Sequence, residues 1–189
     1  MFKITSIYII ILISMAFSNS YKEPEYNLIH KDGTIELRQY SEYVIAKTSI
    51  NQGDIEDNSN MFRTLAGYIF QGNADNQSIP MTAPVITQNN NSNYEMIFFM
   101  LDVDEPEKLP IPNNGDVILE KMELGKTVSI WFGLWATEKR VSYYKKILDG
   151  YIKENNLKID SELMVAQYNS PWTIPPFRKN ELIYRVLDE

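Results

Sequence analysis

The pattern of apolar and polar positions predicts short strands interrupted by two helices. Segments 26–30 and 34–40 alternate in polarity on either side of Lys31-Asp32-Gly33, a sequence typical of a β-hairpin turn. A third strand is expected over 43–50. Apolar residues then recur at the spacing of a helix, and Gly72 is placed to end it; the residues are Phe62, Leu65, Ala66 and Ile69.

The rest of the chain repeats this order of elements. Pro80 and Pro84 favour an extended segment over 80–87, and an apolar strand is expected at 94–101. Further strands are expected at 116–124, 127–131, 162–168 and 181–186, with a helix at 137–154 capped by Thr137 and a proline-rich loop at 169–177. The order predicts an α+β fold, an antiparallel β-barrel of about eight strands with two flanking helices and two halves alike in order.

The first eighteen residues differ from the rest of the chain. Lys3 is their only charge, an apolar run extends from Ile4 to Phe17, and small residues surround Ser18. This pattern predicts a signal peptide over 1–18 and a secreted or periplasmic protein. The run is close to the shortest length that spans a bilayer, so a retained N-terminal membrane anchor is the alternative. Asn76 and Asn90 match the glycosylation acceptor pattern, which matters only in a eukaryotic source.

Composition narrows the possible chemistry. The length of 189 residues suits one domain. The formal net charge is −7 and no basic patch is present, so nucleic acid is not expected as a partner, nor is a membrane surface once the signal peptide is removed. The chain has no Cys and only one His, His30 beside the hairpin turn. Thiolate nucleophiles and two-histidine metal sites are therefore excluded. With no phosphate loop or nucleophile–base pair either, we expect a protein that is not an enzyme.

Three stretches of the chain together resemble the SOUL haem-binding family. They are Ile35-Glu-Leu-Arg-Gln-Tyr40, then Phe62-x-x-Leu65-x-x-Tyr68-Ile69-x-x-Gly72-Asn73 with Ile79-Pro-Met-Thr-Ala-Pro-Val85, and Tyr168-Asn-Ser-Pro171 with Arg178-Lys-Asn-Glu181. The resemblance covers one domain over 24–188. It implies a twisted antiparallel barrel and noncatalytic binding of haem or a related tetrapyrrole. In an exported chain, we expect a carrier or buffer outside the cytoplasm.

The resemblance also implies a binding groove beside the first helix, near the loop between the last two strands. A tetrapyrrole has an apolar face and two carboxylates, so it requires an apolar wall and cations at the rim. The apolar wall would be Met61, Phe62, Leu65 and Ile69; the rim cations would be Arg63, Arg178 and Lys179; the loop aromatics are Trp172 and Phe177. The same helix positions also suit a side packed in the core.

Axial ligation of an iron is not expected to be strong. Where one branch of the family carries a histidine in the early strand, this chain has Gln39, and the basic helix positions of another branch are Ser59 and Gly67. The remaining candidates for a metal ligand are His30 and Met61, with Met81 or a tyrosine behind them. A second hypothesis is an interaction module, or a binder of another apolar ligand, that keeps the fold without haem binding and uses the loop 169–177.

Overall fold

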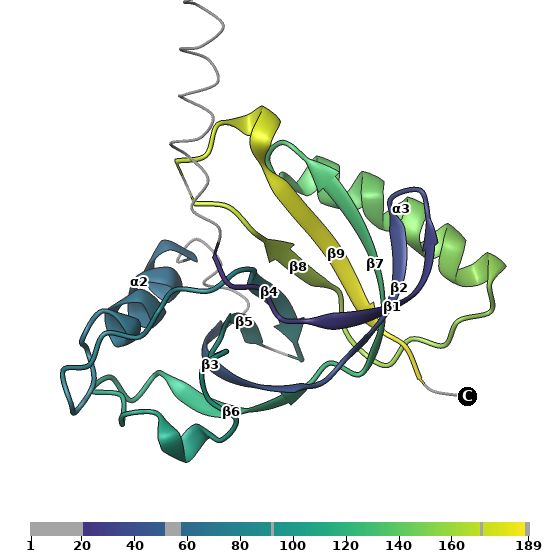
Figure 1. The fold of residues 1–189 in the computed structure, drawn as a ribbon. Coiled ribbons are helices and arrows are strands. Elements are labelled where there is room, and N and C mark those ends of the chain that lie inside the picture. Colours follow the sequence, from purple (N-terminus) through teal and green to yellow (C-terminus); the bar gives the residue numbers. More distant parts are fainter. Residues whose placement is uncertain (1–20, 52–57, 92, 171, 188–189) are drawn as a thin grey trace, which may run out of the picture.

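A computed structural model describes residues 21–51, 58–91, 93–170 and 172–187 (Figure 1). The predicted signal peptide or anchor over 1–18 lies outside the described residues, as does the side chain of Ser59. Within the described part of the chain, no helix is long and apolar enough to cross a membrane.

The described chain forms nine strands and two α-helices. They are β1 (Tyr26–Asp32), β2 (Ile35–Tyr40), β3 (Glu42–Asn51), α2 (Asn58–Ile69), β4 (Val85–Asn90), β5 (Asn93–Phe99), β6 (Ile118–Glu123), β7 (Lys126–Gly133), α3 (Glu138–Glu154), β8 (Met164–Gln167) and β9 (Lys179–Arg185). Thr137 caps α3 by accepting from the amide of Arg140. The predicted α+β class is confirmed, with nine strands instead of about eight.

One expected strand begins later than the sequence indicated. The extended segment predicted over 80–87 becomes a strand only at Val85, because the residues before it contact other parts of the chain. The amide of Ala83 donates to the carbonyl of Lys22 at 3.0 Å, and the hydroxyl of Thr82 donates to the carbonyl of Phe99 at 2.7 Å. These bonds take the place of a regular ladder.

All nine strands belong to one antiparallel sheet in the order β1-β2-β7-β9-β8-β4-β5-β3-β6. Apart from β1 at one edge, the order is symmetric about the β4–β8 pair. On each side the strand that follows a helix lies at the centre, β5 or β9 comes next, and the strand that precedes the helix, β3 or β7, comes third. The two halves are therefore alike in order, as predicted.

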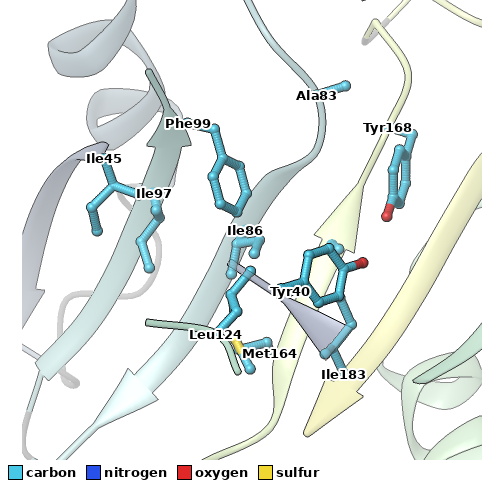
Figure 2. Packing of buried hydrophobic residues seen from close by; sticks show 11 residues of the cluster. Tyr40, Ile45, Ala83, Ile86, Ile97, Phe99, Leu124, Met164, Tyr168 and Ile183 are labelled. Carbon is cyan, nitrogen blue, oxygen red and sulfur yellow. The ribbon is translucent and has the colours of Figure 1, made fainter. Parts of the chain in front are cut away.

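The sheet curls into a half-barrel with two arms and one helix on the outer face of each arm (Figure 1). Helix α2 packs on β3 and β5, and α3 packs on β7 and β9. A third apolar cluster fills the inner face, where Ile45, Ile97 and Phe99 of one arm approach Met164 and Ile183 of the other (Figure 2). Burial on both faces of a sheet explains the continuous apolar run at 96–100.

The N-terminal segment of the described chain connects the two arms. The hydroxyl of Tyr43 on the first arm donates to the carbonyl of Glu25 at 2.6 Å. On the second arm, the ammonium of Lys179 lies 3.3 Å from the carboxylate of Glu23. Together with the bond between Lys22 and Ala83, these contacts place residues 22–25 across one end of the half-barrel.

Candidate functional site

The motif residues of the early strand and of β9 meet in a buried polar network. The guanidinium of Arg38 donates both terminal nitrogens to the carboxylate of Glu181, at 2.7 and 3.0 Å. It also donates to Glu36 at 2.8 Å and to the hydroxyl of Tyr40 at 3.0 Å. The hydroxyl of Tyr168 donates to Glu181 at 2.6 Å, and Figure 2 shows the rings of Tyr40 and Tyr168 on the same inner face.

Burial and hydrogen bonding shift the pKa of four side chains of this network, those of Glu36, Arg38, Tyr40 and Tyr168. Burial raises the pKa of Tyr40 and of Tyr168, and the Glu181 charge adds to the rise at Tyr168, so both phenols stay protonated. Burial alone would lower the pKa of Arg38, but its hydrogen bonds to Glu181 outweigh this and raise it. Burial alone would likewise raise the pKa of Glu36, but hydrogen bonds from Lys31 and Arg38 hold it below the ordinary value. The hydrogen bonds of these side chains to one another link β2 to β9 in the buried interior.

The loop between β8 and β9 presents large apolar side chains to solvent. The side chains of Trp172, Ile174 and Phe177 are 88, 60 and 68% exposed. This loop carries both predicted aromatics, and its second part, Pro175–Phe177, is a short 3-10 helix. Three large apolar side chains exposed on one loop make this loop a candidate binding surface.

Arg178 holds this loop from inside. Its guanidinium donates from Nε to the carbonyl of Thr173 at 2.9 Å and contacts the carbonyl of Ser170 at 3.4 Å. The guanidinium carbon lies 3.6 Å from the ring centre of Trp135, and Arg178 is only 7% exposed. Arg178 was predicted as a rim cation; its contacts instead show a residue that shapes the loop, and its role toward a ligand stays a prediction.

The other two predicted rim cations lie in different parts of the fold, Arg63 exposed and Lys179 partly buried. Arg63 lies on α2 and donates to Asn60 at 3.2 Å. Lys179 begins β9 directly after the loop, and its ammonium lies 3.7 Å from the ring centre of Tyr168. Lys179 is therefore the predicted cation nearest the loop, and a ligand carboxylate there would compete with that of Glu23, which lies 3.3 Å from the same ammonium.

The predicted apolar wall on α2 is mostly packed against the sheet. Met61, Leu65 and Ile69 are at most 2% exposed and belong to the cluster with β3 and β5. Phe62 is half-buried, and its ring meets that of Phe98 edge-on at 5.5 Å. The helix and the loop also lie on different arms of the sheet (Figure 1). The role of these four residues in binding a ligand stays a prediction.

The weak candidates for a metal ligand lie away from the loop and from each other. His30 is exposed on the edge strand β1, and Met61 lies on α2 and is buried against the sheet. Among the residues that the structure describes, no group of three His, Cys, Asp or Glu side chains is arranged to hold a metal ion.

A cavity of about 350 Å³ opens into the inner face at the other end of the strands. Its apolar floor is Ile45, Ile97, Met122 and Met164, and its charged lining includes Lys47, Glu120, Glu162 and Arg185. Sequence reasoning missed this cavity. Glu120 and Glu123 of β6 both line it.

Similar solved structures confirm the architecture. The crystal structure of a Listeria innocua hydrolase is 10% identical over 84% of this chain and 94% of its own, with a TM-score of 0.58. The EcmrR C-terminal domain is 10% identical over 87% and 99%, with a TM-score of 0.61. An uncharacterized conserved protein from Listeria innocua is 11% identical over 93% and 98%, with a TM-score of 0.60. These identities show a shared fold and no more.

No curated protein matches the chain. The family model described as SOUL heme-binding protein matches residues 21–185, which include all nine strands and both helices. The match agrees with the convergence of Arg38, Tyr40, Tyr168 and Glu181 in one network, since each lies in a stretch that carries the resemblance. The chain belongs to the SOUL haem-binding family.

Proposed function

We propose that this protein binds haem or a related tetrapyrrole without catalysis, as a carrier or buffer outside the cytoplasm. Family membership supports the ligand class. The observation that carries the proposal is the exposure of Trp172, Ile174 and Phe177 on one loop held in shape by Arg178. A preorganised apolar surface suits a rigid flat ligand because little conformational entropy is lost on binding.

The loop fits a tetrapyrrole held by its apolar face and does not fit one held through iron. Trp172 and Phe177 can stack on the macrocycle, and Lys179 can pair with a propionate. Residues 172–178 contain no His, Cys, Met or Tyr. When haem is the ligand, its iron would supply any redox chemistry, while the loop only binds and orients the ring.

Two further observations support a binding role in an exported protein. The buried carboxylate of Glu181 accepts hydrogen bonds from Arg38 and Tyr168, and this use of its oxygens supports a structural role for the central network. A structural relative is named a hydrolase, but its 10% identity carries only the fold. The charge and apolar pattern of residues 1–18 supports export.

Parallel titrations with haemin and with iron-free protoporphyrin IX test this proposal. We expect saturable changes in the Soret band with both and dissociation constants within about threefold, since iron adds little without an axial ligand. Replacing both Trp172 and Phe177 by Ala should weaken both ligands at least tenfold. Phe70→Ala, which removes a 63% exposed ring at the end of α2, is the matched control and should bind as the parent does. Absence of saturable binding with both pigments would refute the proposal.

The exposed loop also favours an interaction module as the second candidate. In that case neither pigment binds, and a protein or another apolar compound occupies the loop. Trp172→Ala should then abolish the interaction while leaving the melting temperature nearly unchanged, because the side chain is 88% exposed. A large fall in the melting temperature would show that Trp172 contributes to folding and contradict this reading.

A further inference from the structure

We propose that the cavity inside the half-barrel binds a small amphipathic organic cation, an apolar body that carries one ammonium or guanidinium group. The cavity lies between the β3–β5–β6 arm and the ends of β8 and β9. It holds about 350 Å³, near the lower end for small-molecule sites. The inference does not depend on the tetrapyrrole proposal.

The apolar part of the ligand would lie on the floor of the cavity. Ile45 and Ile97 lie on adjacent strands of one arm, and Met164 faces them from β8 (Figure 2). Met122 of β6 is partly buried against the same cluster. Methionine side chains are flexible and polarizable, so this floor can adapt to alkyl groups of different shape.

The charges around the cavity favour a cation. Each lining cation is already paired: Lys47 with Glu120 at 2.8 Å, Lys121 with Glu105 at 2.8 Å and Arg185 with Asp160 at 3.2 Å. Lys47 and Lys121 each have a second carboxylate nearby, Glu95 at 3.6 Å and Glu42 at 3.2 Å. The remaining lining carboxylates, Glu123 and Glu162, have no ion-pair partner among the described residues.

The charges left unpaired in the lining are negative. The lining carries three cations and three carboxylates, and because all three cations are ion-paired, Glu123 and Glu162 are the lining charges without an ion-pair partner among the described residues. Half-enclosed walls of low polarizability concentrate the field of such charges and raise the local concentration of cations. An anion would find every lining cation already paired with a carboxylate.

The cavity and the exposed loop lie at opposite ends of β9. Arg185, the last residue of that strand, lines the cavity, and Lys179, the first, follows the loop. Six residues of strand separate them, or about 20 Å at ~3.3 Å per residue. Occupation of the cavity and binding at the loop can therefore be measured separately.

Three ligands with the same alkyl chain test the proposal in the full chain: hexylammonium, hexanoate and 1-hexanol. The measurement is the NMR signal of methionine methyl groups labelled with carbon-13. Hexylammonium should shift the Met122 and Met164 signals saturably. Met61 and Met96, beneath α2 in a separate cluster, should not move. Hexanoate and 1-hexanol should bind at least about tenfold more weakly.

Substitution of the two free carboxylates identifies the site. Glu123→Gln with Glu162→Gln should weaken hexylammonium about tenfold, the upper range for two ion pairs made by exposed carboxylates. Glu138→Gln with Glu154→Gln, at the two ends of α3, changes the net charge equally and should leave binding intact. The proposal is overturned if hexanoate or 1-hexanol binds as well as hexylammonium, if Met122 and Met164 do not respond, or if the Glu123 and Glu162 substitutions have no effect.

Discussion

Removing the guanidinium from the buried network should destabilise the fold strongly. In Arg38→Met a side chain of similar length and no charge replaces one that is 3% exposed. Glu181, which is 0% exposed, then loses two hydrogen bonds and keeps only that of Tyr168. Breaking a buried ion pair by removing one partner typically costs about 3–5 kcal/mol. For a domain of this size, that predicts a fall in the melting temperature of roughly 6–20 °C.

Removing the other partner should cost less. In Glu181→Gln the carboxylate becomes an amide, but Arg38 keeps its hydrogen bond to Glu36 at 2.8 Å and its contact with Tyr40. The buried cation therefore remains paired, and we expect a loss of about 1–3 kcal/mol, the usual cost of one weakened hydrogen-bonding partner. Arg38→Met should therefore lower the free energy of unfolding more than Glu181→Gln does, because Glu36 still pairs with Arg38 in the second variant.

The double variant completes a thermodynamic cycle. Arg38→Met combined with Glu181→Gln leaves no unpaired charge at this point, so it should be more stable than the sum of the single effects by at least about 1 kcal/mol. Urea unfolding followed by circular dichroism at pH 7 gives the four free energies. Additive effects, or a loss below about 1 kcal/mol in Arg38→Met, would refute the view that Arg38 and Glu181 are buried as one ion pair.

Two further predictions concern Glu36 and Arg178. The pKa of Glu36 is lowered in the folded state, so its contribution to stability is complete above the ordinary value of 4.5 and is lost as the pH falls through the folded value. The stability difference between the parent and Glu36→Gln should therefore shrink below about pH 4 in urea titrations; a constant difference would contradict it. Arg178→Met should weaken protoporphyrin and its dimethyl ester alike, since it disorders the loop, whereas Lys179→Met should weaken only the diacid. If Arg178→Met affects only the diacid, Arg178 contacts the ligand carboxylate, as the sequence predicts.

The local pattern of apolar and polar residues was sufficient to predict the helices and strands, but not which charged side chains are buried. The spacing of apolar residues predicted α3 over 137–154, and the helix spans Glu138–Glu154 with Thr137 as its cap. The alternation of Glu36, Arg38 and Tyr40 with apolar residues correctly indicated a strand with one polar face. It could not show that this face is buried, because Glu181, the partner of Arg38, lies 143 positions away.

The candidate site was less predictable for a related reason. Met61, Leu65 and Ile69 are the residue types that line an apolar groove and also those that fill a core, and only packing against β3 and β5 distinguishes the two. The sequence could not show that Arg178 is buried and donates to the backbone carbonyl of Thr173, because a backbone acceptor leaves no mark in the sequence; its predicted role at the rim stays a prediction. The sequence predicts that Trp172 and Phe177 lie in an exposed loop, and their exposure is confirmed. The prolines around them explain this exposure, since they prevent the segment from pairing as a strand.

Gln39 allows a test of which end of the fold binds the tetrapyrrole. Gln39 of β2 pairs with Lys126 at the start of β7. The last residue of β7, Gly133, pairs with Lys179, and the loop ends directly before Lys179. Seven residues separate the two ends, or about 23 Å at ~3.3 Å per residue. A histidine at position 39 therefore cannot reach a macrocycle stacked on Trp172.

Gln39→His should accordingly leave the ratio of haemin to protoporphyrin affinity unchanged within about twofold and produce no new iron-ligand absorption bands. Trp172→Ala in the same background should still weaken both pigments. If Gln39→His instead strengthens haemin alone, the macrocycle lies beside β2, and the exposed loop is left for a different partner. The response to this one imidazole thus distinguishes two modes of binding: ligation of the iron by a histidine of β2, and stacking of the macrocycle on the loop aromatics.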